Sequence, residues 1–314
     1  MTKPKVLISD GLAEDGIKLL QGVAEVVTQP KIAADELIAA LPQYQGLVVR
    51  SRTKVTAKVI EAGTSLKVIG RAGVGVDNID VPAALAKGIT VVNSPLAATV
   101  SVAELTLGLM LALAREIPRA DSALKKGEWL KSGLSGSELY GKTLGLVAVG
   151  RIGAAVAGRA VALGMRVMAY DPFLSDDDVR QRQAHPTTLD ELLAVSDYIS
   201  IHSPLTSQTK HLINADSFAR MKNGVRLICA ARGGVIDEAA LLAALESGKV
   251  AGAALDVFET EPPGLTPLTT HPKVIGTPHV GAQTAEAQTR AGVDIAEEVA
   301  AVLTGKTPRW KVTA

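Results

Sequence analysis

Three charged side chains come after apolar, strand-like runs of the sequence. Arg232 comes after "VRLICAA", Glu261 after "AALDVF" and His279 after "VIGTP". In doubly wound sheets, functional groups gather at the carboxyl ends of the strands, so we expect these side chains at one edge. An arginine can bind a substrate carboxylate, a histidine is a base near neutral pH, and a glutamate can orient that base and favour its charged form. The set therefore suits proton transfer on an anionic substrate.

A glycine-rich turn at 148–153, "AVGRIG", departs from the dinucleotide-binding fingerprint G-x-G-x-x-G only at Ala148. The strand-like run "KTLGLVAV" precedes it and the helical pattern "AAVAGRAVALG" follows it. Gly150 would let the backbone approach a pyrophosphate, and Gly153 would let the helix pack closely on the strand. Alanine at position 148 costs roughly 1–2 kcal/mol if the turn needs a positive φ, and is harmless if φ is negative.

An acidic residue stands where such folds bind the adenosine ribose. Asp171 follows the strand-like run "RVMAY" and lies 18 positions after Gly153, near the spacing of about 20 that ribose binding requires. Its carboxylate would accept from the ribose hydroxyls and repel a 2′-phosphate, and no arginine follows in Pro172–Leu174. The sequence therefore predicts NAD as the cofactor, and with Arg232, Glu261 and His279 it indicates a hydride-transfer enzyme.

The sequence lacks the residue patterns of metal-dependent enzymes and of α/β-hydrolases. No histidines are paired at metal-ligand spacing, Cys229 is the single cysteine, and there is no G-x-S-x-G turn, so we expect no metal. A net charge of +1 and 3% aromatic residues are not typical of a nucleic-acid-binding protein, which needs positive charge and often aromatic side chains for base stacking. The most apolar stretch, Val100–Ala114, contains Glu104 and is shorter than the ~20 residues of a membrane span. We expect a cytoplasmic protein with no membrane or nucleic-acid partner.

Strand-like and helical patterns alternate along most of the chain, which is typical of a parallel α/β sheet covered on both faces. A long helix, about Thr99–Lys126, interrupts the alternation, and an amphipathic helix around Thr284–Leu303 closes the chain. We expect two α/β units. The terminal helix can return to the first unit, which makes that unit discontinuous.

Several blocks in order, "GRAGVGVDNID", "SVAELTLGLM", "RGGVIDEAALLAAL", "AALDVFETEPP" and "TPHVGAQT", resemble the D-2-hydroxyacid dehydrogenase family over nearly the whole chain. The resemblance implies a Rossmann-type NAD-binding domain, residues 98–282, inserted in a discontinuous flavodoxin-like α/β substrate (lid) domain, residues 1–97 and 283–314. It also implies a homodimer, or a dimer of dimers, formed through the long-helix region.

The resemblance assigns roles to residues of this sequence. Arg232 would bind the substrate carboxylate and polarise its carbonyl, His279 would exchange the hydroxyl proton, and Glu261 would pair with His279. The cofactor contacts implied are Gly150, Arg151, Ile152, Gly153, Asp171, Ser203, Ala230, Ala231, Arg232, Asp256, His279, Gly281 and Ala282. The substrate contacts implied are Arg50, Ser51, Arg71, Arg232 and the backbone N–H groups of Val74 and Gly75.

Within the family the chain is most similar to the phosphoglycerate dehydrogenases of serine biosynthesis, since Arg50 and Arg71 match substrate-binding positions and Arg52 adds a nearby charge. Leu96–Ala98 and the Ser132–Gly133 pair depart from that pattern. Hydroxypyruvate or glyoxylate reduction and sulfolactate oxidation therefore stay open, as does an NAD(H)-sensing, corepressor-like binding protein. The blocks that carry the resemblance do not include the C-terminal regulatory domain of longer relatives, so feedback inhibition by serine through such a domain is not expected.

Overall fold

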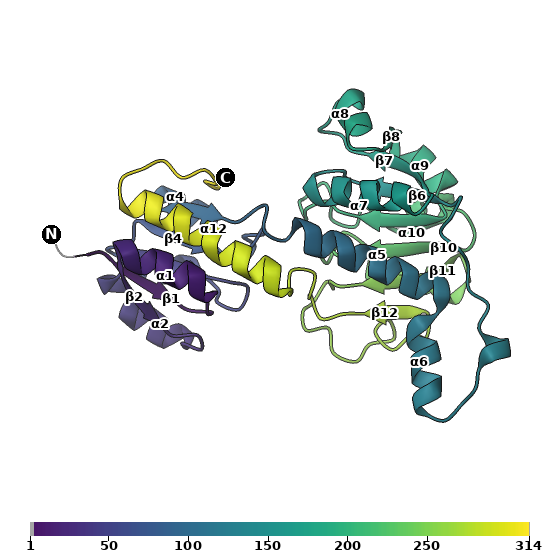
Figure 1. Ribbon diagram of the computed structural model, residues 1–314, viewed down its shortest axis with the longest axis horizontal. Helices are drawn as coiled ribbons and strands as arrows, with labels where there is room; N and C mark the ends of the chain where they lie inside the picture. Colours follow the sequence, from purple (N-terminus) through teal and green to yellow (C-terminus); the bar gives the residue numbers. More distant parts are fainter. Residues whose placement is uncertain (1–2, 314) are drawn as a thin grey trace. The chain divides into compact units, whose positions relative to one another are not determined.

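Parallel strands alternate with helices in both halves of the chain (Figure 1). The structure is a computed structural model that describes residues 3–313. The described residues up to Ala98 and from Ala282 onward form a first unit, and Thr99–Gly281 form a second. The domain boundaries expected from the sequence fall after residues 97 and 282, each one residue from these divisions.

The described residues of the first unit form a five-stranded parallel sheet with the order β2-β1-β3-β4-β5, which is the flavodoxin-like order. Its strands are β1 (Lys5–Ile8), β2 (Glu25–Thr28), β3 (Gly46–Val49), β4 (Val68–Arg71) and β5 (Thr90–Asn93). The central strand β3 is buried along its whole length, as expected for a sheet covered on both faces.

Helices cover both faces of this sheet. They are α1 (Glu14–Val23), α2 (Ala34–Ala40), α3 (Ala57–Ala62), α4 (Val81–Ala86) and α12 (Ala285–Leu303), with a 3-10 turn at Leu41–Gln43. The terminal helix α12 packs against α1 and β4 (Figure 1), and its Ile295 and Val299 are fully buried. The amphipathic terminal helix predicted from the sequence therefore completes the core of the first unit.

The described residues of the second unit form a seven-stranded parallel sheet with the order β12-β11-β10-β9-β6-β7-β8. Its strands are β6 (Thr143–Val147), β7 (Arg166–Tyr170), β8 (His185–Pro186), β9 (Tyr198–Ile201), β10 (Val225–Cys229), β11 (Val250–Leu255) and β12 (Val274–Gly276). Chain order reverses between β6 and β9, the switch point at which Rossmann sheets bind their ligands. The α/β fold class predicted from the sequence is confirmed.

Helices α5 (Thr99–Arg115) and α7 (Arg151–Ala162) pack side by side in the second unit (Figure 1). Its other helices are α6 (Ile117–Lys125), α8 (Asp176–Gln181), α9 (Leu189–Val195), α10 (Ala215–Arg220) and α11 (Glu238–Glu246), with a 3-10 turn at Lys131–Gly133.

The prediction of one long helix from Thr99 to Lys126 is wrong, because the chain breaks between α5 and α6. Glu116 adopts a left-handed conformation with φ of 51°, and Pro118 lies in the first turn of α6. Proline has no N–H to donate and its ring clashes with the carbonyl four residues earlier, so it favours a helix start over a helix interior.

Candidate active site

The turn between β6 and α7 holds the glycine-rich segment. A Cβ added to Gly153 would lie 2.6 Å from the carbonyl oxygen of Ala148, so only glycine permits the helix to begin this close to the strand. A Cβ added to Gly150 would meet no described atom within 4 Å, which leaves open space at the N-terminus of α7. Ala148 has φ of 69°. The turn therefore requires the positive φ for which the fingerprint normally supplies glycine.

Asp171 follows β7 and ties its own loop to the glycine-rich turn. Its Oδ2 accepts from the backbone N–H of Val149 at 3.0 Å, and its Oδ1 accepts from that of Phe173 at 3.1 Å. A carboxylate has lone pairs left after two such bonds. Asp171 can therefore hold the turn in place and still accept from ribose hydroxyls.

Residues at the carboxyl ends of β9 and β10 fit a bound dinucleotide. Ser203, after β9, is 6% exposed, and its Oγ has no hydrogen-bond partner among the described residues. A buried hydroxyl of this kind is satisfied when a polar ligand reaches it. Ala230 and Ala231 follow β10, and Arg151 and Ile152 begin α7. The buried hydroxyl and the open space above Gly150 both fit the NAD expected from the sequence.

The candidate base and its carboxylate partner are in direct contact. Nδ1 of His279 lies 2.8 Å from Oε2 of Glu261, and Oε1 of Glu261 accepts from the backbone N–H of Phe258 at 3.2 Å. The side chains of His279 and Glu261 are 47% and 38% exposed, so substrate and solvent can reach the imidazole. Because Nδ1 faces the carboxylate, Nε2 is the ring nitrogen left for proton exchange.

Asp256 holds the loop that carries His279. This buried carboxylate accepts from Thr277 Oγ1 at 2.5 Å and from the backbone N–H groups of Val280 and Gly281, both at 2.8 Å. The bonds fall on both sides of His279, whose backbone adopts φ of 53°. The structure therefore gives Asp256 a positioning role in addition to the cofactor contact expected from the resemblance.

Arg232 lies on the loop after β10, and a glycine brings that loop close to the one that carries Glu261. A Cβ on Gly233 would lie 1.8 Å from the carbonyl oxygen of Phe258, which only glycine avoids. Nη1 of Arg232 donates to the carbonyl of Ala231 at 2.7 Å. Parallel strands β10 and β11 pair directly, so the loops with Arg232 and Glu261 leave the same edge of the sheet.

His202 is a residue that the sequence reasoning did not single out. It follows β9, its Nε2 lies 2.9 Å from Ser200 Oγ, and a Cβ on Gly153 would be 3.7 Å from its Cδ2. Burial lowers the pKa of His202 to about 4, because an apolar surrounding disfavours the charged imidazole. The signal for it was a histidine at the very end of a strand-like run.

The substrate residues predicted in the first unit lie at the carboxyl edge of its sheet. Arg50 and Ser51 follow β3, and Arg71 ends β4, where it pairs with Val49. The loop that holds Val74 and Gly75 is fixed by Asn93, whose Nδ2 donates to the carbonyl of Val74 at 2.6 Å. Arg52 adds a half-exposed guanidinium beside this set, and its Nη2 donates to Ser9 O at 2.7 Å and lies 3.1 Å from Asp10 Oδ1.

Among residues 3–313, no group of three or more histidine, cysteine or acidic side chains could hold a metal ion. Within the same stretch, every helix is too short or too polar to span a membrane. Cys229 is a buried free thiol, and burial raises its pKa to about 11.

Residues 107–281 match the family model described as D-isomer specific 2-hydroxyacid dehydrogenase, NAD binding domain. The chain belongs to this family. The match covers most of the second unit, including the glycine-rich turn, Asp171 and the three candidate catalytic residues. The family resemblance predicted from the sequence and the expectation of NAD as cofactor are both confirmed.

Relatives and solved structures extend the similarity over nearly the whole chain. A D-3-phosphoglycerate dehydrogenase of Methanocaldococcus jannaschii is 51% identical over 96% of this chain and 58% of its own length. A hydroxypyruvate reductase of Thermotoga maritima is 50% identical over 95% of this chain and 98% of its own length. The structure of D-lactate dehydrogenase from Aquifex aeolicus with NAD and lactic acid has a TM-score of 0.83 and 32% identity, with 96% of each chain covered. The chain thus spans less than two thirds of the first of these relatives.

Proposed function

We propose that this chain catalyses the reversible, NAD-dependent oxidation of a small D-2-hydroxy acid to the 2-oxo acid. The observation that carries the proposal is the 2.8 Å contact between His279 and Glu261, on loops that leave the same sheet as the glycine-rich turn and Arg232. A base alone would suit many reactions. A base beside a dinucleotide turn suits removal of a hydroxyl proton together with a hydride.

Each of the three side chains has a distinct task. In oxidation, Nε2 of His279 takes the substrate hydroxyl proton, and in reduction it returns that proton to the carbonyl oxygen. Glu261 keeps the imidazole oriented and stabilises the imidazolium. Arg232 binds the substrate carboxylate through its planar guanidinium, which matches the two carboxylate oxygens. Bound NAD supplies the hydride acceptor.

For the substrate, we propose 3-phosphoglycerate and its 2-oxo acid. Arg50 and Arg71 at the edge of the first sheet supply the cations that a phosphorylated acid needs, and several of the most similar relatives are D-3-phosphoglycerate dehydrogenases. Hydroxypyruvate is the second candidate. It is favoured by the Thermotoga maritima hydroxypyruvate reductase, which this chain matches over almost its full length.

A substrate panel tests both the reaction and the choice of acid. NADH consumption is measured with 3-phosphohydroxypyruvate, hydroxypyruvate, glyoxylate, pyruvate and sulfopyruvate. The highest kcat/KM is expected for 3-phosphohydroxypyruvate. A preference for hydroxypyruvate selects the second candidate. NADH binding without turnover on any 2-oxo acid contradicts the enzymatic proposal and favours an NAD(H)-sensing binding protein.

We also propose that the protein assembles as a homodimer through α5, α6 and the segment that follows them. Leu124 and Trp129 are 58% and 79% exposed there. They line a hollow of about 220 Å³ together with Ala120, Leu130, Lys131 and Leu134. Exposed apolar patches of this kind mark protein interfaces. Light scattering should show a dimer, and Trp129→Glu should give monomers; an unchanged dimer would contradict this interface.

We propose that the protein acts in the cytoplasm. Its buried free thiol, Cys229, fits a reducing compartment in which cysteines remain unpaired. Fractionation of the native host tests this placement, since recovery of the protein from an oxidising compartment would contradict it.

A further inference from the structure

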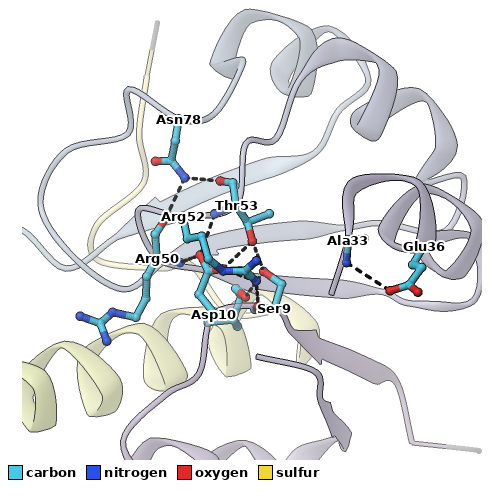
Figure 2. A network of polar contacts seen from close by, with 9 residues as sticks. Ser9, Asp10, Ala33, Glu36, Arg50, Arg52, Thr53 and Asn78 are labelled. Atoms are coloured by element: carbon cyan, nitrogen blue, oxygen red, sulfur yellow. Dashed lines mark hydrogen bonds and ion pairs between the residues drawn. The ribbon is translucent and has the colours of Figure 1, made fainter. Parts of the chain in front are cut away.

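The segment Arg50–Thr53, which follows β3, is fixed by a buried carboxylate. The side chain of Asp10 is 3% exposed. Its Oδ2 accepts from the backbone N–H groups of Arg50 and Thr53 at 2.7 and 3.1 Å, and its Oδ1 accepts from Thr53 Oγ1 at 2.5 Å (Figure 2). One carboxylate thus binds both ends of a four-residue turn.

Asn78 fixes the same turn through the opposite backbone groups. Its Nδ2 donates to the carbonyl oxygens of Arg50 and Thr53, both at 2.7 Å (Figure 2). Ser9 Oγ donates to Thr53 Oγ1 at 3.0 Å and completes the network. Acceptors from Asp10 and donors from Asn78 therefore hold both the N–H and the C=O groups at positions 50 and 53. We call Asp10, Asn78 and Thr53 the clamp.

The two arginines of this turn have different surroundings. The side chain of Arg52 is 50% exposed, and its Nη2 lies 2.7 Å from Ser9 O and 3.1 Å from Asp10 Oδ1, so its charge is paired with that carboxylate. The Arg50 guanidinium points away from the clamp (Figure 2), and its Nη2 lies 3.5 Å from Oε1 of Gln283. Burial lowers the pKa of Arg50, and the nearby Asp10 carboxylate opposes this effect. Among the described residues, the Arg52 guanidinium has a carboxylate partner, whereas the Arg50 guanidinium contacts only the Gln283 amide, so Arg50 is the arginine we expect to pair with an anion.

We infer that Asp10 and Asn78 are positioning residues that set Arg50 and Ser51 to bind the phosphoryl group of the substrate, while Arg52 serves the clamp. The inference rests on the proposed function. In this inference the three clamp residues act through the backbone of the turn and not by direct contact with substrate. The fixed backbone gives the long Arg50 side chain a defined origin, and a shift of about 1 Å at such a group can weaken its interaction by as much as ~100-fold. The clamp therefore governs discrimination between phosphorylated and unphosphorylated acids.

The test compares 3-phosphohydroxypyruvate with hydroxypyruvate in the variants Arg50→Gln and Asp10→Asn. Arg50→Gln should raise KM for the phosphorylated acid about 100-fold, because charged hydrogen bonds to phosphate are lost. Asp10→Asn should raise the same KM roughly 10- to 100-fold with kcat nearly unchanged. In both variants KM for hydroxypyruvate should rise by a much smaller factor than KM for the phosphorylated acid, since hydroxypyruvate has no phosphoryl group to hold.

Four further variants separate the loss of positioning from a general loss of stability. Glu36→Gln is the matched control for Asp10→Asn, because Glu36 lies in the same unit and accepts from the backbone N–H of Ala33, away from the clamp. It should leave both KM values unchanged. Thr53→Ser keeps the hydroxyl and should behave as the wild type, whereas Thr53→Val should resemble Asp10→Asn. Arg52→Gln should raise KM for the phosphorylated acid less than Arg50→Gln does. Equal effects of Asp10→Asn on both acids, or a larger effect of Arg52→Gln, would overturn the inference.

Calorimetry with 3-phosphoglycerate and D-glycerate compares the binding of a phosphorylated and an unphosphorylated acid without turnover. A failure of the clamp inference can therefore be told apart from a failure of the proposed dehydrogenase activity. Wild-type protein should bind 3-phosphoglycerate more tightly than D-glycerate, and Asp10→Asn should remove most of that difference. An unchanged difference in Asp10→Asn, or no preference in the wild type, would overturn the inference even if hydroxypyruvate is turned over.

Discussion

His279 Nδ1 and Glu261 Oε2 lie 2.8 Å apart, and the other oxygen of Glu261 is held by the backbone N–H of Phe258. The carboxylate is thus fixed at both oxygens before any substrate arrives. An imidazole bonded in this way keeps one tautomer, with Nε2 directed away from its partner. The contact is the arrangement that proton exchange at a substrate hydroxyl requires.

The first prediction concerns this contact. Glu261→Gln keeps the size of the side chain but removes the negative charge that stabilises the imidazolium, so kcat should fall roughly 100-fold. NADH affinity, measured by fluorescence titration, should change little. Glu259→Gln is the matched control, because Glu259 contacts His211 and not His279. Equal losses in the two variants would show that Glu261 has no special part in the reaction.

The second prediction concerns cofactor choice. Asp171→Asn removes the charge that repels a 2′-phosphate, so the ratio of kcat/KM values for NAD over NADP should fall at least ~10-fold. Asp171→Ala should also lower the melting temperature, because the bonds to Val149 and Phe173 are lost. Asp178→Asn on α8 serves as a control that removes a charge elsewhere. An unchanged ratio in Asp171→Asn would exclude a role in selecting NAD.

The third prediction concerns Ala148 and its φ of 69°. Ala148→Gly should relieve backbone strain of about 1–2 kcal/mol and lose part of that gain to the greater freedom of the unfolded chain, a net stabilisation of roughly 0.5–1 kcal/mol. NAD affinity should be retained or improved. Ala155→Gly within α7 is the matched substitution and should destabilise by about 1 kcal/mol. A lower free energy of unfolding for Ala148→Gly in denaturant titrations would contradict the inference that Ala148 is strained.

The fourth prediction concerns His202, whose pKa is lowered from 6.5 to about 4. Because the folded protein binds this proton more weakly than the unfolded chain, the histidine's contribution to stability is complete above pH 6.5 and decreases as the pH falls toward 4. The free energy of unfolding should drop by about 2 kcal/mol between pH 7 and 5 from this residue.

His202→Gln should remove this part of the pH dependence, whereas the exposed His185→Gln should keep it. The free energies are compared by urea titrations at each pH. Identical pH profiles for wild type and His202→Gln would show that the buried imidazole does not resist protonation.

Much of the fold could be predicted because the strands are short, apolar and non-alternating, as in parallel sheets with both faces covered. The strand-like run "RVMAY" coincides with β7, and "KTLGLVAV" contains β6. The break at Glu116 was missed because the helical periodicity continues across it, although Pro118 favours a helix start over a helix interior. The two-residue strand β8 is too short to leave a pattern.

The site was predictable in its residue types and not in its contacts. Arg232, Glu261 and His279 could be singled out as candidates because each comes after a strand-like run, where parallel sheets place their functional groups. The link from Asp256 to the loop around His279 joins positions more than twenty residues apart, so no local pattern reveals it. Arg50 and Arg52 look alike in sequence, and their side-chain contacts distinguish them: Arg52 pairs with Asp10, whereas Arg50 contacts Gln283.

The most direct test of the central claim is the turnover of His279→Gln with its best 2-oxo acid, measured beside its affinity for NADH. Glutamine preserves bulk and polarity but cannot exchange the substrate proton, so the rate should fall about 10²- to 10⁴-fold while the dissociation constant for NADH changes less than about threefold. A variant that keeps more than about a tenth of the wild-type rate would contradict the assignment of His279 as the base.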